Sequence, residues 1–113
     1  MSAPDRLLAQ RERYAPVFHA LGDATRLSLL ARLSDGAPCS IAKLTEDTKL
    51  TRQAVTKHLK VLEQARLVRS ARQGRESRFA FNPEPIDAVR GYLDLVSRQW
   101  DAALDRLRRF VER

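Results

Sequence analysis

The chain has 113 residues, of which 43% are hydrophobic and 31% charged, and a formal net charge of +7. This length supports one domain with a hydrophobic core and is too short for two, and the composition is that of a globular protein and not of a disordered chain. No apolar run reaches the length of a membrane span and the first residues lack the apolar stretch of a signal peptide, so we expect a cytoplasmic protein without membrane contact.

The first predicted helix covers residues 5–21. Proline suits the first turn of a helix, so Pro16 predicts either a kink or a fresh start inside this segment. Apolar residues that repeat roughly on one side of the segment are candidates for an interface between subunits, namely Leu7, Tyr14 and Phe18.

Asp23 can cap the second predicted helix, residues 24–33, because its carboxylate can accept a hydrogen bond from a first-turn N–H group. The spacing of the leucines in this helix places three of them inward: Leu27, Leu30 and Leu33. Residues 34–38 are rich in turn-forming residues and predict a loop.

Two short helices joined by a tight turn come next, and together they predict a helix-turn-helix. Ser40 can cap the first of them, residues 41–48, whose inward residues we expect to be Ile41, Ala42 and Leu44. The turn that follows contains no glycine, so Thr48 or Lys49 must adopt a left-handed backbone conformation, at a cost of roughly 1 kcal/mol.

The second helix of this pair, Thr51 to Gln64, is named the reader helix. Thr51 can cap it, and a stripe that consists of Val55, Leu59 and Leu62 is expected to be buried. The opposite face carries groups that can pair with base edges in the major groove of DNA: Arg52, Gln53, Thr56 and Lys57. Thr51 and Lys60 are candidates for contacts to the DNA backbone. Taken alone, this helix could equally present an ordinary solvated face.

After the reader helix the periodicity changes from helix to strand. Residues 67–72 and 77–81 flank a turn that contains Gly74, which predicts a β-hairpin wing over residues 67–82 with Phe79 and Phe81 on one face. The cations of this hairpin are candidates for phosphate or minor-groove contacts: Arg72, Arg75 and Arg78.

Positive charge is concentrated in the reader helix and the wing. Residues 51–78 contain eight Lys and Arg residues against Glu63 and Glu76, which gives a net charge of +6 and leaves +1 for the rest of the chain. Such a concentration is expected of a surface that binds phosphates. A membrane-surface patch is the competing interpretation, but the segment lacks the bulky apolar face of interfacial helices.

A long final helix is predicted over residues 84–112. Its apolar residues repeat at alternating spacings of three and four: Ile86, Val89, Leu93, Val96, Trp100, Ala103, Leu107 and Phe110. Such a helix runs about 40 Å, which is longer than a small domain needs for its own core. We therefore expect it to form a homodimer interface, through Leu93, Val96, Trp100 and Leu107. Packing against the first helix of the same chain is the alternative, and both can hold together.

Three segments, LGDATRLSLLARL, SIAKLTEDTKLTRQAVTKHLKVLEQARLV and RQGRESRFAFNP, resemble together the ArsR-type (arsenical-resistance repressor) winged helix-turn-helix regulators. The resemblance runs from about Tyr14 to Pro83, and the long final helix also fits. It implies a mainly α fold with a small β-hairpin wing, dimeric through its terminal helices, and a bacterial transcriptional repressor that a signal releases from its operator. In the family pattern, the positions matched by Thr51, Arg52, Gln53, Thr56 and Lys57 face the groove.

The chain departs from the metal-sensing members of this family. Arsenic and lead sensors carry paired cysteines at the start of the helix before the reader helix, where this chain has Ser40, Ile41 and Ala42. Zinc and cobalt sensors use histidines with carboxylates on the final helix, and this helix has no histidine. Since carboxylates alone select transition metals poorly, we expect no metal site and no cofactor.

The expected protein is a single domain over residues 1–113, with an N-terminal dimerisation helix (1–21), a DNA-binding core (23–83) and a C-terminal dimerisation helix (84–112). It would repress transcription by placing two reader helices in successive major grooves of an inverted-repeat operator in double-stranded DNA. No catalytic constellation is recognisable, so we expect no enzyme. Two alternatives stay open, a dimeric winged-helix module that binds proteins and a repressor whose signal is oxidation of Cys39. The inducer is unknown.

Overall fold

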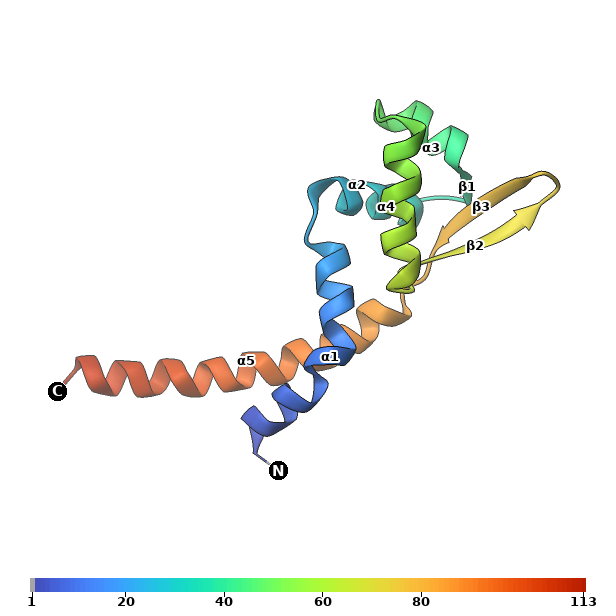
Figure 1. The fold of residues 1–113 in the computed structure, drawn as a ribbon. Helices are drawn as coiled ribbons and strands as arrows, with labels where there is room; N and C mark the ends of the chain where they lie inside the picture. Colours follow the sequence, from blue (N-terminus) through green and yellow to red (C-terminus); the bar gives the residue numbers. More distant parts are fainter. Residues whose placement is uncertain (1) are drawn as a thin grey trace.

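Helices dominate the structure, a computed structural model that describes residues 2–113 (Figure 1). The elements in chain order are α1 (Ala3–Leu21), α2 (Ala24–Ser34), β1 (Cys39–Ser40), α3 (Ile41–Thr48), α4 (Arg52–Gln64), β2 (Val68–Gln73), β3 (Glu76–Phe81) and α5 (Glu84–Val111). The expected fold class, mainly α with a small β wing, is confirmed. No helix in the described part of the chain is both long and apolar enough to cross a membrane.

Side-chain caps determine where the helices begin. Asp23, Ser40 and Thr51 each accept a hydrogen bond from the backbone N–H three residues later, at 3.0, 3.1 and 3.1 Å, so the three predicted caps are present. α1 begins earlier than predicted because Ser2 and Asp5 form a capping box, in which each side chain bonds the backbone N–H of the other residue.

Pro16 lies inside α1 and does not end it. Figure 1 shows that the helix bends along its length, as expected where proline removes a hydrogen bond to the preceding turn. Of the two possibilities that the sequence left, a kink and a fresh start, the structure shows the kink. The buried side of α1 is formed by Val17 and Ala20, with Tyr14 partly buried beside them.

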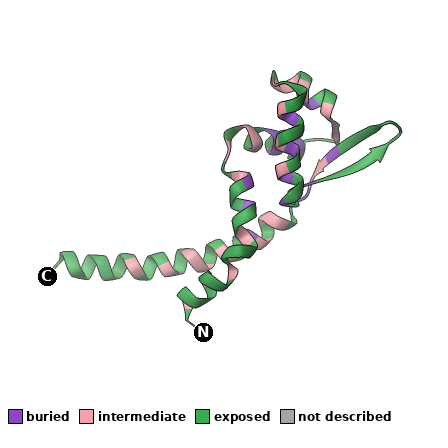
Figure 2. Cartoon of the chain, viewed as in Figure 1, coloured by how far each residue is buried: buried purple, intermediate pink, exposed green. Residues whose placement is uncertain are grey.

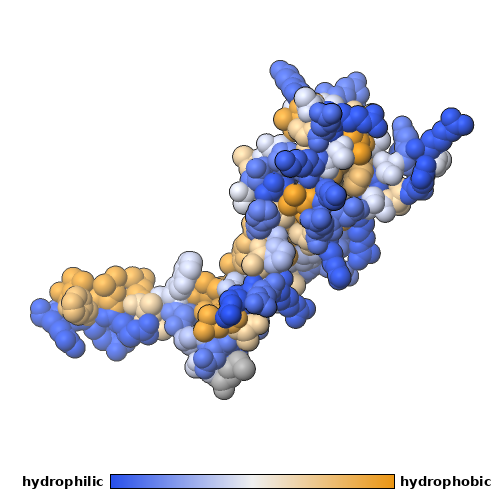
Figure 3. Space-filling view, viewed as in Figure 1, coloured by the Kyte–Doolittle hydropathy of each residue, from blue (hydrophilic) through white to orange (hydrophobic). Residues whose placement is uncertain are grey.

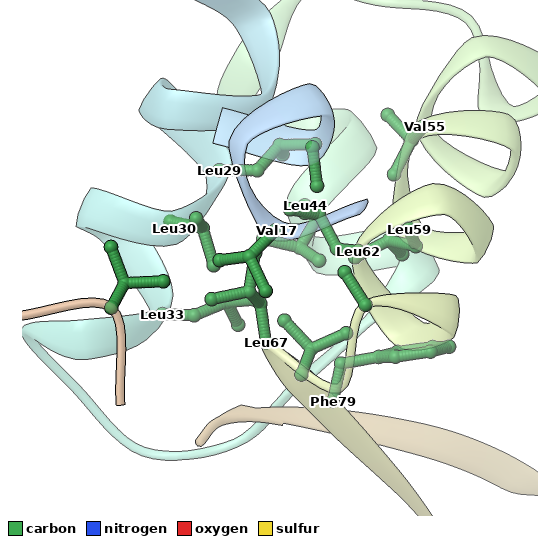
Figure 4. Close-up of a cluster of buried hydrophobic side chains, with 14 residues drawn as sticks. Val17, Leu29, Leu30, Leu33, Leu44, Val55, Leu59, Leu62, Leu67 and Phe79 are labelled. Carbon is green, nitrogen blue, oxygen red and sulfur yellow. The ribbon is translucent and has the colours of Figure 1, made fainter. Parts of the chain in front are cut away.

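The hydrophobic core lies where α2, α3, α4 and the base of the wing meet (Figure 4). Its largest fully buried side chains are Leu29, Leu44, Leu59, Leu62, Leu67, Val55 and Val68. The reader helix contributes three of them, which are the three that its helical spacing predicted. The helix is therefore held by packing along its whole inner face.

Two residues that were expected in the core lie on the surface. Leu27 is 49% exposed, and its neighbour Leu29 is fully buried in its place. The segment contains so many leucines that helical spacing alone fits more than one inner face. Ala42 is also exposed, and Ile41 and Leu44 alone form the apolar inner side at the start of α3.

Two residues other than glycine adopt the left-handed backbone conformation. Lys49, with φ of 58°, ends α3, and it is one of the two candidates for this conformation in the helix-turn-helix turn. Arg66, with φ of 62°, lies between α4 and β2 and was not predicted. Because such a conformation costs roughly 1 kcal/mol, contacts around each residue must hold it in place.

The wing is a three-stranded antiparallel sheet in the order β1-β3-β2. β2 and β3 pair along their whole length around a two-residue turn, in which Gly74 has φ of 66°. The predicted hairpin is confirmed, and Phe79 is buried while Phe81 packs at the edge of the core. The third strand, β1, was not predicted, because its two residues form a strand only through pairing with β3.

The first turns of α5 alone pack closely against the rest of the chain. Val89 is 4% exposed, and Tyr92 lies against Tyr14 of α1 with 5.1 Å between the ring centroids. Beyond this contact α5 projects away from the other elements, and Figure 2 shows it exposed over most of its surface. The molecule is consequently elongated, at 66 × 28 × 22 Å.

The cap of α2 predicts a pH dependence of stability. The hydrogen bond from the Arg26 backbone N–H, partly offset by burial and assisted by the Arg26 charge, lowers the pKa of Asp23 below its ordinary value of 3.8. The carboxylate therefore stabilises the folded state above pH 3.8, and this contribution is lost as the pH falls through the folded pKa. Asp23→Asn keeps a capping side chain without the charge.

We expect the wild-type protein to have a higher free energy of unfolding than Asp23→Asn at about pH 6. This difference should shrink as the pH is lowered to about 3. Urea unfolding of both proteins across this range, at one protomer concentration, measures the difference. A difference that does not change with pH would show that the charge of Asp23 contributes nothing to stability.

Candidate nucleic-acid interface

The reader helix, α4, separates an apolar face from a polar one. Its inner face is buried in the core, and its outer face is exposed to solvent along the helix. A shallow hollow of about 700 Å³ lies on this outer face. Its lining consists of the residues of this helix that the sequence predicts to contact DNA, Thr51, Arg52, Gln53, Thr56, Lys57 and Lys60. The structure thus brings all six onto one accessible surface.

The two threonines of this surface offer different groups to DNA. The Thr56 hydroxyl donates to the backbone carbonyl of Arg52 at 2.7 Å, so it presents oxygen lone pairs and a methyl group outward. Thr56 can then accept from the amino group of adenine or cytosine, or contact the methyl of thymine, whereas the guanine edge requires a donor. The Thr51 hydroxyl accepts from the Ala54 N–H, so its own proton can be donated to an anion at the helix N-terminus.

His58 lies at the border of the buried stripe and contacts Arg26 of α2. Arg26 Nη1 lies 3.4 Å from His58 Nδ1, and because a guanidinium only donates, Nδ1 is the acceptor in this contact. The side chain of Arg26 is only 11% exposed and also donates to the carbonyls of His19 and Ala20, at 3.0 and 2.8 Å. Both a packing role and a DNA contact are possible for a histidine at this border, and this geometry favours packing.

The wing carries exposed cations on both strands. Within the described residues, Arg72 and Arg75 have no ion-pair partner, whereas Arg78 lies 3.7 Å from Glu76 of the same strand. Figure 3 shows hydrophilic side chains over the wing and over much of the helix-turn-helix surface in this view. The wing and the reader helix therefore both carry exposed cations on a predominantly hydrophilic part of the molecule.

The first helix packs against the last one within the protomer. The rings of Tyr14 and Phe18 lie 5.1 and 5.9 Å from that of Tyr92, measured between centroids. Phe18 nevertheless keeps 36% of its surface exposed, and Leu7 is partly buried. The alternative of packing within one chain is therefore correct for this part of α1, and it leaves apolar surface for a second subunit.

The outer two thirds of α5 carry an apolar stripe that nothing in the protomer covers. Trp100 and Phe110 are each 70% exposed, and Val96 and Ala103 on the same helix are partly exposed. Other exposed large apolar residues of this helix are Leu93, Leu104, Leu107 and Val111. Figure 3 shows this segment with a hydrophobic and a hydrophilic side. Contiguous apolar surface of this kind marks an interaction site in a protein that folds in water.

No group of three or more His, Cys, Asp or Glu side chains lies close enough to hold a metal ion anywhere in residues 2–113. Cys39 is half-buried in β1, and its thiol donates to the Ala37 carbonyl at 3.4 Å. The expectation of a protein without metal or cofactor stays a prediction.

Comparison with known proteins agrees with this geometry. Residues 21–71 match the model of a helix-turn-helix domain family. The chain is 40% identical over 85 residues to the HTH-type transcriptional regulator YuzN of Bacillus subtilis. The matched segment covers 69% of this chain and 92% of YuzN. The chain is also 29% identical over 77 residues to the arsenical resistance operon repressor of Bacillus subtilis. This matched segment covers 68% of the chain and 73% of the repressor.

The similarity extends to three-dimensional structure. The solved structure of an ArsR-like transcriptional regulator from Rhodococcus sp. RHA1 has a TM-score of 0.82 and 30% identity, over 93% of this chain and 95% of that one. These relatives are transcriptional regulators, which are not enzymes. The chain belongs to the ArsR-type family of winged helix-turn-helix proteins, and it is a DNA-binding transcriptional regulator.

Proposed function

We propose that this regulator is a homodimeric bacterial repressor that acts in the cytoplasm and binds an inverted-repeat operator. The observation that carries the proposal is the reader helix, whose exposed face gathers six polar and cationic residues that the sequence predicts to contact DNA. The 29% identity to the arsenical resistance operon repressor supports repression as the mode of action.

The residues of the proposed DNA surface divide into two groups by their chemistry and position. Base edges in the major groove are read by Arg52, Gln53, Thr56 and Lys57, which can pair with guanine, adenine or thymine. The DNA backbone is bound by Thr51, Lys60, Arg72, Arg75 and Arg78, of which the first lies at a helix N-terminus and the last three on the wing. The first group sets specificity and the second supplies affinity.

The proposed dimer uses both terminal helices, residues 1–21 and 84–112, and leaves residues 23–83 to bind DNA. The interface includes Leu7, Tyr14, Phe18, Leu93, Val96, Trp100 and Leu107. The exposed apolar stripe of α5 supports it, because the stripe continues the buried start of the same helix into open solvent. A two-fold axis would present the two reader helices to half-sites roughly 34–36 Å apart, which is one turn of DNA.

Changing Gln53 to Ala is expected to relax specificity at one base pair of each half-site. Loss of the amide removes a bidentate contact to adenine, so discrimination at that position should fall by about 1–3 kcal/mol. Competition titrations against operator variants that differ at single base pairs measure this effect. The operator itself can be obtained by selection from randomised duplexes.

Changing Arg75 to Ala serves as the comparison, because this residue lies in the turn at the tip of the wing. Its loss should weaken binding to operator and unrelated duplexes alike. The slope of the logarithm of the binding constant against the logarithm of salt concentration should fall by about one charge per protomer. If Gln53→Ala and Arg75→Ala changed specificity and salt dependence in the same way, the proposed division of roles would be wrong.

A further inference from the structure

Asn82 is the one buried polar residue in the described part of the chain, with 8% of its surface exposed. It lies between the end of β3 and the beginning of α5. A buried amide side chain is costly unless its hydrogen bonds are made, so its partners show what it holds together.

The partners of Asn82 belong to two different junctions. Its side-chain Nδ2 donates to the backbone carbonyl of Arg66 at 2.8 Å, and its backbone N–H donates to the carbonyl of Leu67 at 2.9 Å. Both acceptors lie in the turn between α4 and β2. Its Oδ1 accepts from the N–H of Glu84 at 3.4 Å, in the first turn of α5, where the helix has no other side-chain cap. One side chain therefore joins the end of the reader helix to the beginning of α5.

The Arg66 turn is held by this contact together with two backbone hydrogen bonds, in which the N–H groups of Arg66 and Leu67 donate to the carbonyls of Glu63 and Leu62, both at 2.9 Å. Arg66 holds the left-handed conformation, with φ of 62°, without being glycine. The bond from Asn82 to the Arg66 carbonyl adds a side-chain contact to these backbone bonds at the point where the chain leaves α4. Figure 1 shows that α4 ends where α5 begins, so this turn also determines how the two helices are oriented.

Packing alone leaves this junction incompletely filled. A hollow of about 400 Å³ lies beside Asn82 and is lined by residues of α1, of the end of α4 and of the start of α5, among them Tyr14 and Ala88. The other polar link across the region, between Arg69 and Glu84 at 3.2 Å, involves two largely exposed side chains and contributes little. The Asn82 hydrogen bonds are thus the buried side-chain polar contacts that link the end of α4 to the start of α5, beside the apolar packing of Ile86 and Val89 in the core.

We propose that Asn82 is a positioning residue that sets the spacing of operator half-sites that the dimer accepts. This inference rests on the proposed function, in which α5 joins the two subunits. If α5 is the shared axis of the dimer, the angle between α4 and α5 in each protomer sets the distance and orientation of the two reader helices. Asn82 acts on DNA recognition through that angle and touches no base.

Asn82→Asp is the variant that tests this role most closely. The aspartate side chain has the same size and keeps the oxygen that accepts from the Glu84 N–H. It replaces the amide nitrogen that donates to the Arg66 carbonyl with a carboxylate oxygen, which cannot donate. Asn82→Ala is the second variant, which removes all side-chain bonds. Val89→Ala is the matched control, because Val89 is buried at the start of α5 and its loss destabilises the same region without touching the Asn82 bonds.

The measurement is the affinity of each dimer for a series of duplexes in which two identical half-sites are moved apart or together by one and two base pairs. For the wild-type protein we expect a displacement of two base pairs to weaken binding about tenfold or more, because a rigid dimer cannot follow the rotated site. For Asn82→Asp we expect the same displacement to weaken binding less than about threefold, whereas Val89→Ala should keep the wild-type preference. Thermal unfolding of each variant records stability separately.

The outcomes distinguish failure of the positioning role of Asn82 from failure of the proposed dimeric repressor. A broadened spacing preference in both Asn82 variants, with the control unchanged, supports the positioning role. The positioning role is overturned if both Asn82 variants keep the wild-type preference for half-site spacing. It is also overturned if Val89→Ala broadens that preference as much as they do. Either result leaves the proposed dimeric repressor intact. A wild-type protein that binds all spacings equally overturns the inverted-repeat repressor together with the inference.

Discussion

Replacing Trp100 with glutamate is expected to convert the protein to a monomer and to weaken operator binding by about 100-fold or more. Trp100 lies at the middle of the apolar stripe of α5 and is 70% exposed in the protomer. In the proposed dimer its indole would be buried between subunits, where a carboxylate would lack both water and a counter-charge. A monomer then binds each half-site separately and loses the advantage of two linked contacts.

The exposure of Trp100 makes this test specific to the dimer. Because the side chain contacts little of its own protomer, the substitution should leave the fold of the monomer intact, and circular dichroism should show a wild-type helix content. Sedimentation equilibrium measures the state of association, and titration of the selected operator measures affinity. Ala102→Glu is the matched control, since Ala102 lies exposed on the same helix, away from the stripe, and receives the same charge.

One result would contradict a dimer that forms through α5. If Trp100→Glu stayed dimeric and bound the operator as tightly as Ala102→Glu, the subunits would not associate through the middle of α5. The exposed stripe would then serve another purpose.

The second large effect is expected from Leu59, which lies at the centre of the buried face of the reader helix and is fully enclosed. Leu59→Ala should lower the free energy of unfolding by about 2–5 kcal/mol, through the lost burial of the side chain and the cavity that it leaves. A domain of this size has a total stability of roughly 5–15 kcal/mol, so the variant should be unfolded in a substantial fraction at elevated temperature. The polar face of α4 cannot be presented without this packing.

Urea unfolding at a fixed protomer concentration measures this loss, because the apparent stability of a dimer depends on concentration. Lys60→Ala is the control on the neighbouring, exposed position, where the change should stay within about 0.5 kcal/mol. A Leu59→Ala protein that lost less than about 1 kcal/mol would show that the reader helix is held by something other than its apolar stripe.

The parts of this fold that follow from local chemistry could be predicted from the sequence. The caps at Asp23, Ser40 and Thr51 were found because their side chains bond N–H groups only three residues away. The inner and outer faces of α4 were found because its apolar spacing fits only one helical face. A left-handed residue was expected at Thr48 or Lys49 because the short turn contains no glycine, and the structure shows it at Lys49.

What could not be predicted depends on residues far apart in the sequence. β1 has two residues and exists only because β3 pairs with it. The exposure of Leu27 follows from the orientation of α2 against three other elements, which the repeated leucines do not determine. In the sequence Asn82 is only the last residue of the predicted wing. Its burial and its bond to Arg66, which lies 16 residues earlier, arise when the two junctions meet.

Sequence-specific binding of an inverted repeat can be tested by selecting bound sequences from a pool of randomised duplexes at physiological salt. For a dimeric repressor we expect a single enriched consensus with two-fold symmetry, whose half-sites are centred about 10–10.5 base pairs apart. Affinity for this consensus should exceed that for a scrambled duplex of equal length by about 10³-fold or more. Enrichment of no sequence, with equal binding of all duplexes that disappears as salt rises, would contradict this expectation, since the basic surface would then hold phosphates without reading bases.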